Sequence, residues 1–154
     1  MQAGLYLTAM RGMGSPEAGI CYERAEPLCH SLGQPLLRYV ALIGQWRYSL
    51  HTDKVSTALQ IAQRANALAR QQNDAALMIG ACRALASTLY YLGDFESVRQ
   101  HAVRGFQIWR SGTVHSSIEE YYTPAVACLG MWPFPSGISE RSPLAMRTWP
   151  KRSQ

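Results

Sequence analysis

The chain has 154 residues, of which 47% are hydrophobic and 16% charged, which is enough for one folded domain and excludes a disordered chain. Alanine and leucine dominate while valine and isoleucine are scarce, which favours helix over sheet. The net charge of +5 is uneven, because residues 1–130 hold eleven Lys/Arg against nine Asp/Glu. A nearly neutral folded part disfavours nucleic-acid binding, which needs a basic face.

The cysteines and the N-terminal segment indicate the compartment. Cys21, Cys29, Cys82 and Cys128 form no Cys-x-x-Cys pair and match no histidine spacing of a metal site, so we expect buried free thiols. Arg11 follows the first apolar run, whereas a signal peptide places its charge before it. The sequence has no run of about 20 apolar residues, so we expect no membrane span and a cytoplasmic protein.

Three segments spaced 40 residues apart share one helical pattern. They are Ser15–Ser31, Val55–Gln71 and Phe95–Ser111. The coinciding residues, called the seam below, are Ala18, Ala58 and Val98; Tyr22, Ala62 and Ala102; Ala25, Ala65 and Gly105; and Leu28, Leu68 and Ile108. Their spacing predicts one face of a helix that a second helix approaches closely. Ser15-Pro16-Glu17 is a good helix start, while Pro27 is expected to kink or shorten the first helix.

Two partner helices are expected between these segments. Leu36–Leu50 and Ala75–Leu92 each carry an apolar face and are followed by a short polar break. Gly93 can adopt the left-handed conformation that closes a helix, and Asp94 can cap the next one, while Asn73-Asp74 is expected to cap the helix before it. Breaks this short make neighbouring helices antiparallel.

The predicted fold is therefore all-α. A single hairpin cannot bury its faces, so we expect a right-handed α-solenoid of about three antiparallel hairpins over residues 1–130. Trp46 and Trp109 are expected in its core. A further helix is expected from Ser116, whose spacing to Glu119 fits a capping box, as far as Leu129.

Residues 131–154 form a Pro-rich, basic tail without apolar periodicity, which we expect to be disordered. A solenoid that stopped within a hairpin would leave an apolar helix face uncovered. We therefore expect the chain to be a truncated or frame-shifted fragment of a longer protein.

The segment Ala75–Leu92, its turn and the start of the next segment are similar to a tetratricopeptide (TPR) motif. The matching residues are Leu85, Ala86, Leu89, Tyr90, Gly93, Asp94, Phe95, Val98 and Ala102. The preceding hairpin departs from the motif, because Asp53 stands where the turn glycine is expected and Val55 where the turn aromatic is expected. The period of 40 also exceeds the usual ~34 residues, which predicts helices about one turn longer.

Residues 4–129 resemble the TPR-like region that follows the ATPase module in large bacterial signalling proteins. Those proteins are predicted AAA or NB-ARC-type ATPases, often with a class III adenylate/guanylate cyclase domain. The resemblance is carried by Gly14–Ala18, Arg24–Cys29, Leu32-Gly33, Trp46–Tyr48 and Ala84–Phe95. It implies autoinhibition, effector sensing or assembly rather than chemistry.

Catalytic motifs are missing from the sequence. It contains neither G-x-x-x-x-G-K-[ST] nor G-x-G-x-x-G. We therefore expect no enzyme, no cofactor and no metal. The alternative is a non-catalytic piece that belongs to a parent ATPase or cyclase.

Repeated basic residues form the first candidate binding surface. Arg24, Arg64 and Arg104 share one repeat position, and a second set consists of His30, Arg70 and Arg110. Stacked repeats would align each set as a ladder able to meet an acidic helix or peptide. The alternative is a solvated face that keeps the domain soluble.

The inner groove of a TPR-like stack is the second candidate surface. The residues that map to it are Ile43, Arg47, Arg83, Ser87, Tyr90 and Tyr91. Arginine and tyrosine are frequent binding hot spots. The alternative is that both tyrosines pack against neighbouring helices.

We expect a protein–protein interaction or regulatory scaffold. Its partners would be a peptide, sister domains of a parent protein, or another copy of the chain. Nucleic-acid binding through the arginine ladders or the tail is the remaining alternative, and it would show a steep salt dependence.

Overall fold

The computed structural model describes residues 2–111, which form six α-helices and no β-strand. The helix expected at 116–129, the tail at 131–154 and Cys128 lie outside the described residues. The helices are α1 Gln2–Arg11, α2 Pro16–Ser31, α3 Pro35–His51, α4 Val55–Gln71, α5 Ala75–Tyr91 and α6 Phe95–Arg110. The prediction of an all-α protein is confirmed over this range. None of these helices combines the length and apolar character needed to cross a bilayer.

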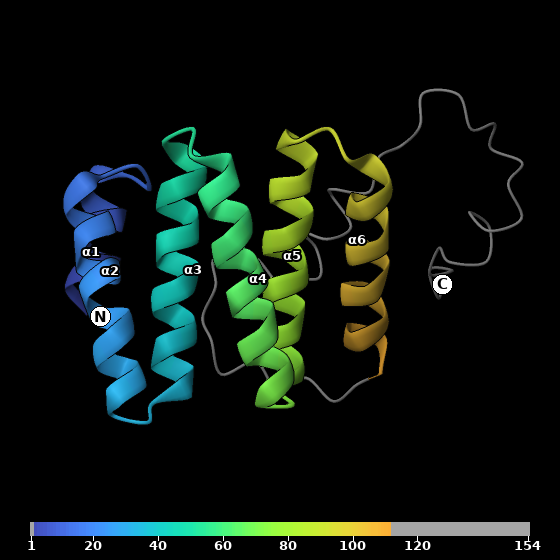
Figure 1. Cartoon of the computed structure of the whole chain (residues 1–154), viewed down its shortest axis with the longest axis horizontal. Coiled ribbons are helices and arrows are strands. Elements are labelled where there is room, and N and C mark those ends of the chain that lie inside the picture. Colours follow the sequence, from blue (N-terminus) through green and yellow to red (C-terminus); the bar gives the residue numbers. More distant parts are fainter. Residues whose placement is uncertain (1, 112–154) are drawn as a thin grey trace, which may run out of the picture.

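The helices repeat with the period found in the sequence. Helices α3, α4 and α5 have 17 residues each, and three residues separate each from the next helix. Successive helices lie side by side and run in alternating directions (Figure 1). Each helix packs against its sequence neighbour, and α3 also contacts α5.

The turns between helices share one backbone conformation. Gly93 has φ +77°, and Asp53, at the equivalent position one period earlier, has φ 57°. Gly33 and Asn73 form a second such pair, with φ +62° and +49°. Each of these residues lies two positions after the last residue of a helix, in the left-handed region that glycine adopts most readily. Asp53 therefore takes the conformation of the glycine it replaces.

Side-chain caps begin three helices; those at Ser15 and Asp94 were predicted, whereas Asp74 caps the helix that follows it and not the one before it. Asp74 accepts hydrogen bonds from the backbone N–H groups of Ala76 and Leu77, at 2.8 and 3.1 Å. Asp94 accepts one from the N–H of Ser97 at 3.1 Å. The hydroxyl oxygen of Ser15 accepts one from Ala18 N–H, with Pro16 at the first helical position. These bonds satisfy donors that have no partner within their own helix.

The seam is buried, with one exception. Its first three positions in α2, α4 and α6 are buried or half-buried in every helix. The fourth position is not buried in α2, where Leu28 is 61% exposed and the next residue, Cys29, is buried instead. Helix α1 has only 10 residues against the 16 of α2, so it cannot cover the last turns of its neighbour. The prediction of a buried Leu28 is therefore wrong.

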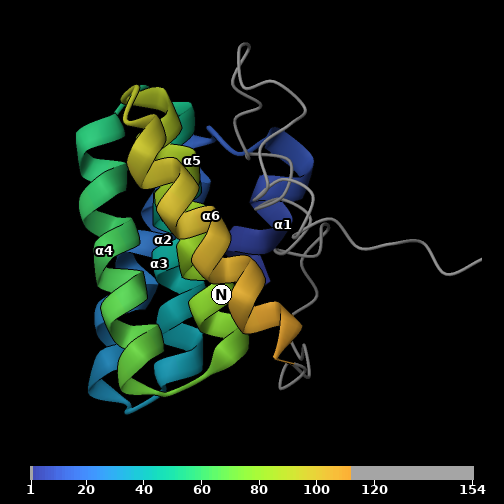
Figure 2. The same ribbon diagram turned by 90° about the vertical axis from the view of Figure 1, so that its right-hand side faces the viewer.

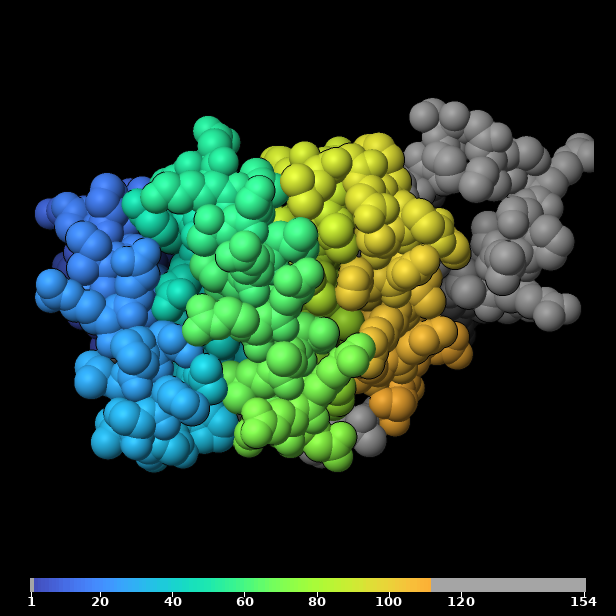
Figure 3. All heavy atoms as spheres, in the orientation of Figure 1, coloured from blue at the N-terminus to red at the C-terminus, as the bar shows by residue number. Residues whose placement is uncertain are grey.

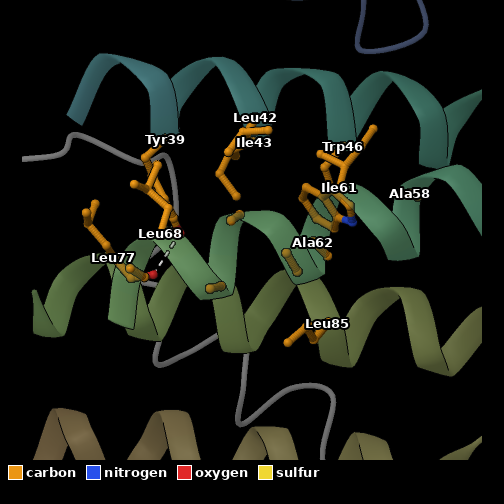
Figure 4. Packing of buried hydrophobic residues seen from close by; sticks show 14 residues of the cluster. Tyr39, Leu42, Ile43, Trp46, Ala58, Ile61, Ala62, Leu68, Leu77 and Leu85 are labelled. Atoms are coloured by element: carbon orange, nitrogen blue, oxygen red, sulfur yellow. Dashed lines mark hydrogen bonds between the residues drawn. The ribbon is translucent and has the colours of Figure 1, made fainter. Parts of the chain in front are cut away.

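The main core lies between α3, α4 and α5. Figure 4 shows Tyr39, Ile43 and Trp46 of α3 facing Ile61 and Leu68 of α4. Its buried members are Tyr39, Leu42, Ile43, Trp46, Ala58, Ile61, Ala62, Ala65, Leu68, Ala69, Leu77, Ala81, Ala84 and Leu85. Alanine dominates the α4 side, which allows close helix approach.

The structure also tests the predictions made for the tryptophans, the cysteines and Pro27, with different outcomes. Trp46 is buried as predicted, but Trp109 is 45% exposed and stacks on Phe106 of the same helix, so its core assignment is wrong. Cys29 and Cys82 are buried free thiols, as expected. Helix α2 continues to Ser31 and is not shortened at Pro27, which is exposed, so water can reach the carbonyl that loses its partner.

Tyrosine rings packed on glycines hold α1, α2 and α3 together. The ring of Tyr22 lies against both Gly4 of α1 and Gly44 of α3, and a Cβ at Gly44 would come within 2.5 Å of its Cε1. The second contact between α2 and α3 has the ring on α3 and the glycine on α2: Tyr48 packs on Gly19, where a Cβ would lie 2.7 Å from the ring. Only residues without a side chain permit these approaches.

We predict that Asn73→Gly raises the free energy of unfolding by about 0.5–1 kcal/mol, because relief of left-handed strain outweighs the added chain entropy of glycine. Gly93→Ala should lower it by about 1 kcal/mol for the converse reason. Urea denaturation followed by circular dichroism measures both, and a loss of stability in Asn73→Gly would contradict the strain argument.

We predict that Gly44→Ala lowers the free energy of unfolding by about 1–3 kcal/mol, because the added methyl overlaps the buried Tyr22 ring. Gly14→Ala is the matched control, since its nearest atom would lie at 3.7 Å, and should change stability by less than about 0.5 kcal/mol. The loss should shrink in a Tyr22→Ala background. Equal effects of Gly44→Ala in both backgrounds would rule out the overlap.

Candidate functional site

The residues predicted for the inner groove separate into three groups. Ile43 and Ser87 are buried, so they do not form an exposed binding surface, and for these two the prediction is wrong. Arg47 and Arg83 are half-buried. Tyr90 and Tyr91 are 50% and 66% exposed, although the ring of Tyr90 also contacts Phe95 of the neighbouring helix α6, as the alternative expected. Ile43 is buried because it points from α3 into the core (Figure 4).

A buried tryptophan fixes the position of Arg83. The indole Nε1–H of Trp46 in α3 donates to the hydroxyl of Thr88 in α5 at 2.9 Å. That hydroxyl donates in turn to the carbonyl of Ala84 at 2.8 Å. The guanidinium carbon of Arg83 lies 5.2 Å from the centroid of the Trp46 ring, within cation–π range. The arginine is thus partly ordered before any partner binds.

Sequence reasoning assigned Trp46 to the core and did not single out Thr88. Both lie beneath the predicted groove, where they orient Arg83 rather than contact solvent. Their spacing of 42 residues gives no periodic signal, because one residue belongs to α3 and the other to α5. Only the lateral contact of the two helices reveals the pair.

Exposed apolar residues gather where α5 ends and α6 begins. Tyr90, Tyr91, Leu92 and Phe95 are each about half exposed or more, and they are called the aromatic patch below. The ring of Tyr90 meets those of Tyr91 and Phe95 edge to face, with centroids 6.1 and 5.8 Å apart. Such contacts hold the rings in a defined arrangement at little entropic cost to a binding event.

Residues 83, 87 and 90 are spaced four and three apart along α5, so they share one helix face. Arg83 and Tyr90, the first residue of the aromatic patch, therefore lie on the same side of α5, about two helical turns apart. This face combines an ordered guanidinium with exposed aromatic rings, which are the residue types that dominate protein interfaces.

The second candidate surface lies on α2, α4 and α6. Both predicted ladders are exposed in the structure: Arg24, Arg64 and Arg104, and His30, Arg70 and Arg110. Figure 3 shows α4 in the middle of one face of the molecule, with α2 and α6 on either side. All six residues are therefore accessible to a partner, while their alignment as two binding ladders stays a prediction.

Arg64 already has a carboxylate partner within the fold. Its guanidinium Nη2 lies 3.0 Å from an oxygen of Glu26 in α2. The other oxygen of Glu26 accepts a hydrogen bond from Arg38 Nε of α3 at 2.7 Å. Burial favours a raised pKa for the 13%-exposed Glu26 carboxyl, but the two arginines outweigh it and lower the pKa. The three charges tie α2, α3 and α4 together.

Arg70 and Arg104 occupy different surroundings. Both guanidinium charges act on His101 of α6 and on Cys82 of α5. Burial lowers the pKa of His101, and Arg104 and Arg70 lower it further, while Asp94 opposes the shift. Burial raises the pKa of the Cys82 thiol despite the two arginines. Within residues 2–111, no carboxylate forms a salt bridge with Arg70 or Arg104.

Between residues 2 and 111, no three His, Cys, Asp or Glu side chains are grouped closely enough to hold a metal ion. Cys29 is buried and its neighbour His30 exposed, so the two side chains point apart. Comparison of the chain with protein-family models, curated proteins and solved structures finds no match. The function therefore has to be argued from the two surfaces themselves.

We predict that Glu26→Gln lowers the free energy of unfolding at pH 7 by about 1–2 kcal/mol, because two arginines lose their shared carboxylate. The lowered pKa means that this stabilisation is present above pH 4.5, the ordinary pKa, and is lost as the pH falls through the lower pKa of the folded state. Glu23→Gln, an exposed change on the same helix, is the control. Urea titrations between pH 3 and 7 should show the two variants converging in acid, and a pH-independent difference would contradict the ion-pair account.

Proposed function

We propose that the chain is a TPR-like protein-interaction module, in which antiparallel hairpins stack as a right-handed solenoid. The 40-residue spacing of turns and seams supports this arrangement, as does the lateral contact between α3 and α5. Figure 2, which looks along the row of helices, shows α4 on one side and α1 on the other, with α3 and α5 between them. In such a stack α1, α3 and α5 are the first helices of their hairpins.

The module binds a peptide segment of a partner protein at the end of α5, where the exposed Tyr90 and Tyr91 follow the half-buried Arg83. The observation that carries this proposal is the aromatic patch beside the pre-ordered Arg83. Exposed, adjoining aromatic rings are costly to leave in water and are a mark of interaction sites. Arg83 adds a donor fork for a carboxylate or a backbone carbonyl of the ligand.

We further propose that the module belongs to a multidomain bacterial signalling ATPase and regulates it by binding. The support for this context is the sequence from Ala84 to Phe95, which resembles that of such proteins and contains much of the proposed binding face. The module itself contributes recognition, and any nucleotide chemistry resides in other domains of the parent protein. A copy of the chain or a sister domain could supply the bound segment.

A displayed random peptide library should yield ligands for the full chain. We predict that Tyr91→Ala weakens binding of a selected peptide about tenfold, because an exposed aromatic anchor is lost. Arg83→Lys should weaken peptide binding less, since lysine keeps the positive charge but cannot donate two parallel hydrogen bonds as the guanidinium does. Isothermal titration calorimetry measures both.

Gln60→Ala, an exposed change on α4, is the matched control and should leave the affinity unchanged. Ligands that are insensitive to Tyr91→Ala, or equally sensitive to Gln60→Ala, would contradict binding on this face of α5.

A further inference from the structure

One arginine position repeats along the fold, but its carboxylate partner does not. Arg64 of α4 meets Glu26 of α2 at 3.0 Å. A shift of one 40-residue period converts this pair into Arg104 of α6 and Asn66 of α4. The arginine is retained, whereas the carboxylate is replaced by a neutral amide. On this surface Arg64 therefore forms an ion pair, whereas Arg104, one period later, has no carboxylate partner within the described residues.

Positive charge is also concentrated around Arg104. Arg70 of α4 and Arg104 of α6 both act on His101 and Cys82, so their charges converge on one part of the α5–α6 hairpin. Both arginines are exposed. Like charges held near one another repel, and an anion placed between them removes that repulsion. Arginine is also the side chain best shaped to bind a carboxylate with two parallel hydrogen bonds.

We propose that Arg104 and Arg70 form an acceptor site for an acidic side chain, Asp or Glu, of a partner protein, because the repeat position equivalent to Glu26 holds the neutral Asn66. The partner's carboxylate gives Arg104 the ion pair that Glu26 gives Arg64 one period earlier. The inference rests on the proposed function, because it gives the interaction module a second contact on the face opposite to its first helices. A protein ligand is favoured over nucleic acid because residues 1–130 carry eleven basic against nine acidic side chains, too balanced for a polyanion.

His101 provides a reporter inside the site. The charged groups that act on it are Arg104 and Asp94 from α6 and its cap, and Arg70 from α4, with the Cys82 thiol of α5 beside the same arginines. A bound carboxylate favours the protonated imidazole, so it raises the pKa of His101. By linkage, the site binds its anion more tightly as the pH falls through that pKa.

The test uses the full chain and a blocked hexaglutamate peptide as the probe. NMR titration should show the probe shifting the resonances of α4 and α6 and raising the pKa of His101. Arg104→Gln and Arg70→Gln should each weaken binding about fivefold or more. Arg24→Gln, an exposed arginine of the same ladder two periods away, should have no effect.

The most specific variant restores the missing carboxylate. Asn66→Glu should pair with Arg104 inside the fold, raise the pKa of His101 without the probe, and abolish probe binding while stability is kept or increased. Asn66→Gln, which has the same length but no charge, should still bind. Because Asn66→Glu is expected to fold at least as well as the parent chain, loss of binding cannot be attributed to unfolding.

Two outcomes would overturn the inference. Either the probe binds Asn66→Glu as well as it binds the parent chain, or a thymidine oligonucleotide binds more tightly than hexaglutamate and depends on Arg70, which would identify a nucleic-acid site. Tyr91→Ala should leave hexaglutamate binding unchanged. If hexaglutamate does not bind at Arg104 while peptide binding still depends on Tyr91, this inference is wrong and the proposed function stands. If peptide binding does not depend on Tyr91 while hexaglutamate binds at Arg104, the proposed function is wrong and the arginine site stands.

Discussion

Tyr22 of α2 lies between two glycines that belong to different helices, Gly4 of α1 and Gly44 of α3. Its hydroxyl also lies 3.3 Å from that of Thr8 in α1. A side chain at either glycine would push the helices apart, so the ring and the two gaps set the spacing of α1, α2 and α3 together. The reciprocal contact of Tyr48 with Gly19 fixes the same spacing from the other side. Helices α4, α5 and α6 are stacked on this arrangement.

Later in the chain the same spacing is reached with smaller side chains. Ala62 and Ala102 occupy the positions equivalent to Tyr22, and Ala84 the position equivalent to Gly44. All three are buried. Two alanines, Ala62 and Ala84, thus stand where the earlier helices have a large ring and a glycine, and together they are smaller than that pair. Buried polar contacts then align α3 with α5.

Two hydrogen bonds carry that alignment and create the candidate binding face. The hydroxyl of Tyr39 donates to the carbonyl of Leu77 at 2.8 Å, over the gap left by Gly80 (Figure 4). The indole of Trp46 donates to Thr88 nearly three turns further along α5. Because buried polar groups need partners with defined geometry, these bonds permit one register of α3 against α5. Arg83 is positioned by that register, so the site depends on the packing beneath it.

The sequence predicts the periodic features of the fold well. A helical seam, a polar break and a capping aspartate each depend on residues within a few positions of one another, as Asp94 and Ser97 show. Contacts between different helices were not predicted. Glu26 could not be assigned to Arg64, 38 residues away, and the exposure of Leu28 depends on the length of α1 rather than on its own surroundings. The exposure of Tyr90 and Tyr91 was left open because TPR-like periodicity is equally compatible with packing.

The arrangement of Tyr22 between two glycines can be observed directly in solution. In a NOESY spectrum of the full chain, the ring protons of Tyr22 should give cross-peaks to the Hα protons of both Gly4 and Gly44. These residues are 18 and 22 positions away from Tyr22, so no single helix brings them together. Cross-peaks to both glycines are the predicted result. A well-dispersed spectrum without either of them would contradict the helix spacing on which the rest of the structure depends.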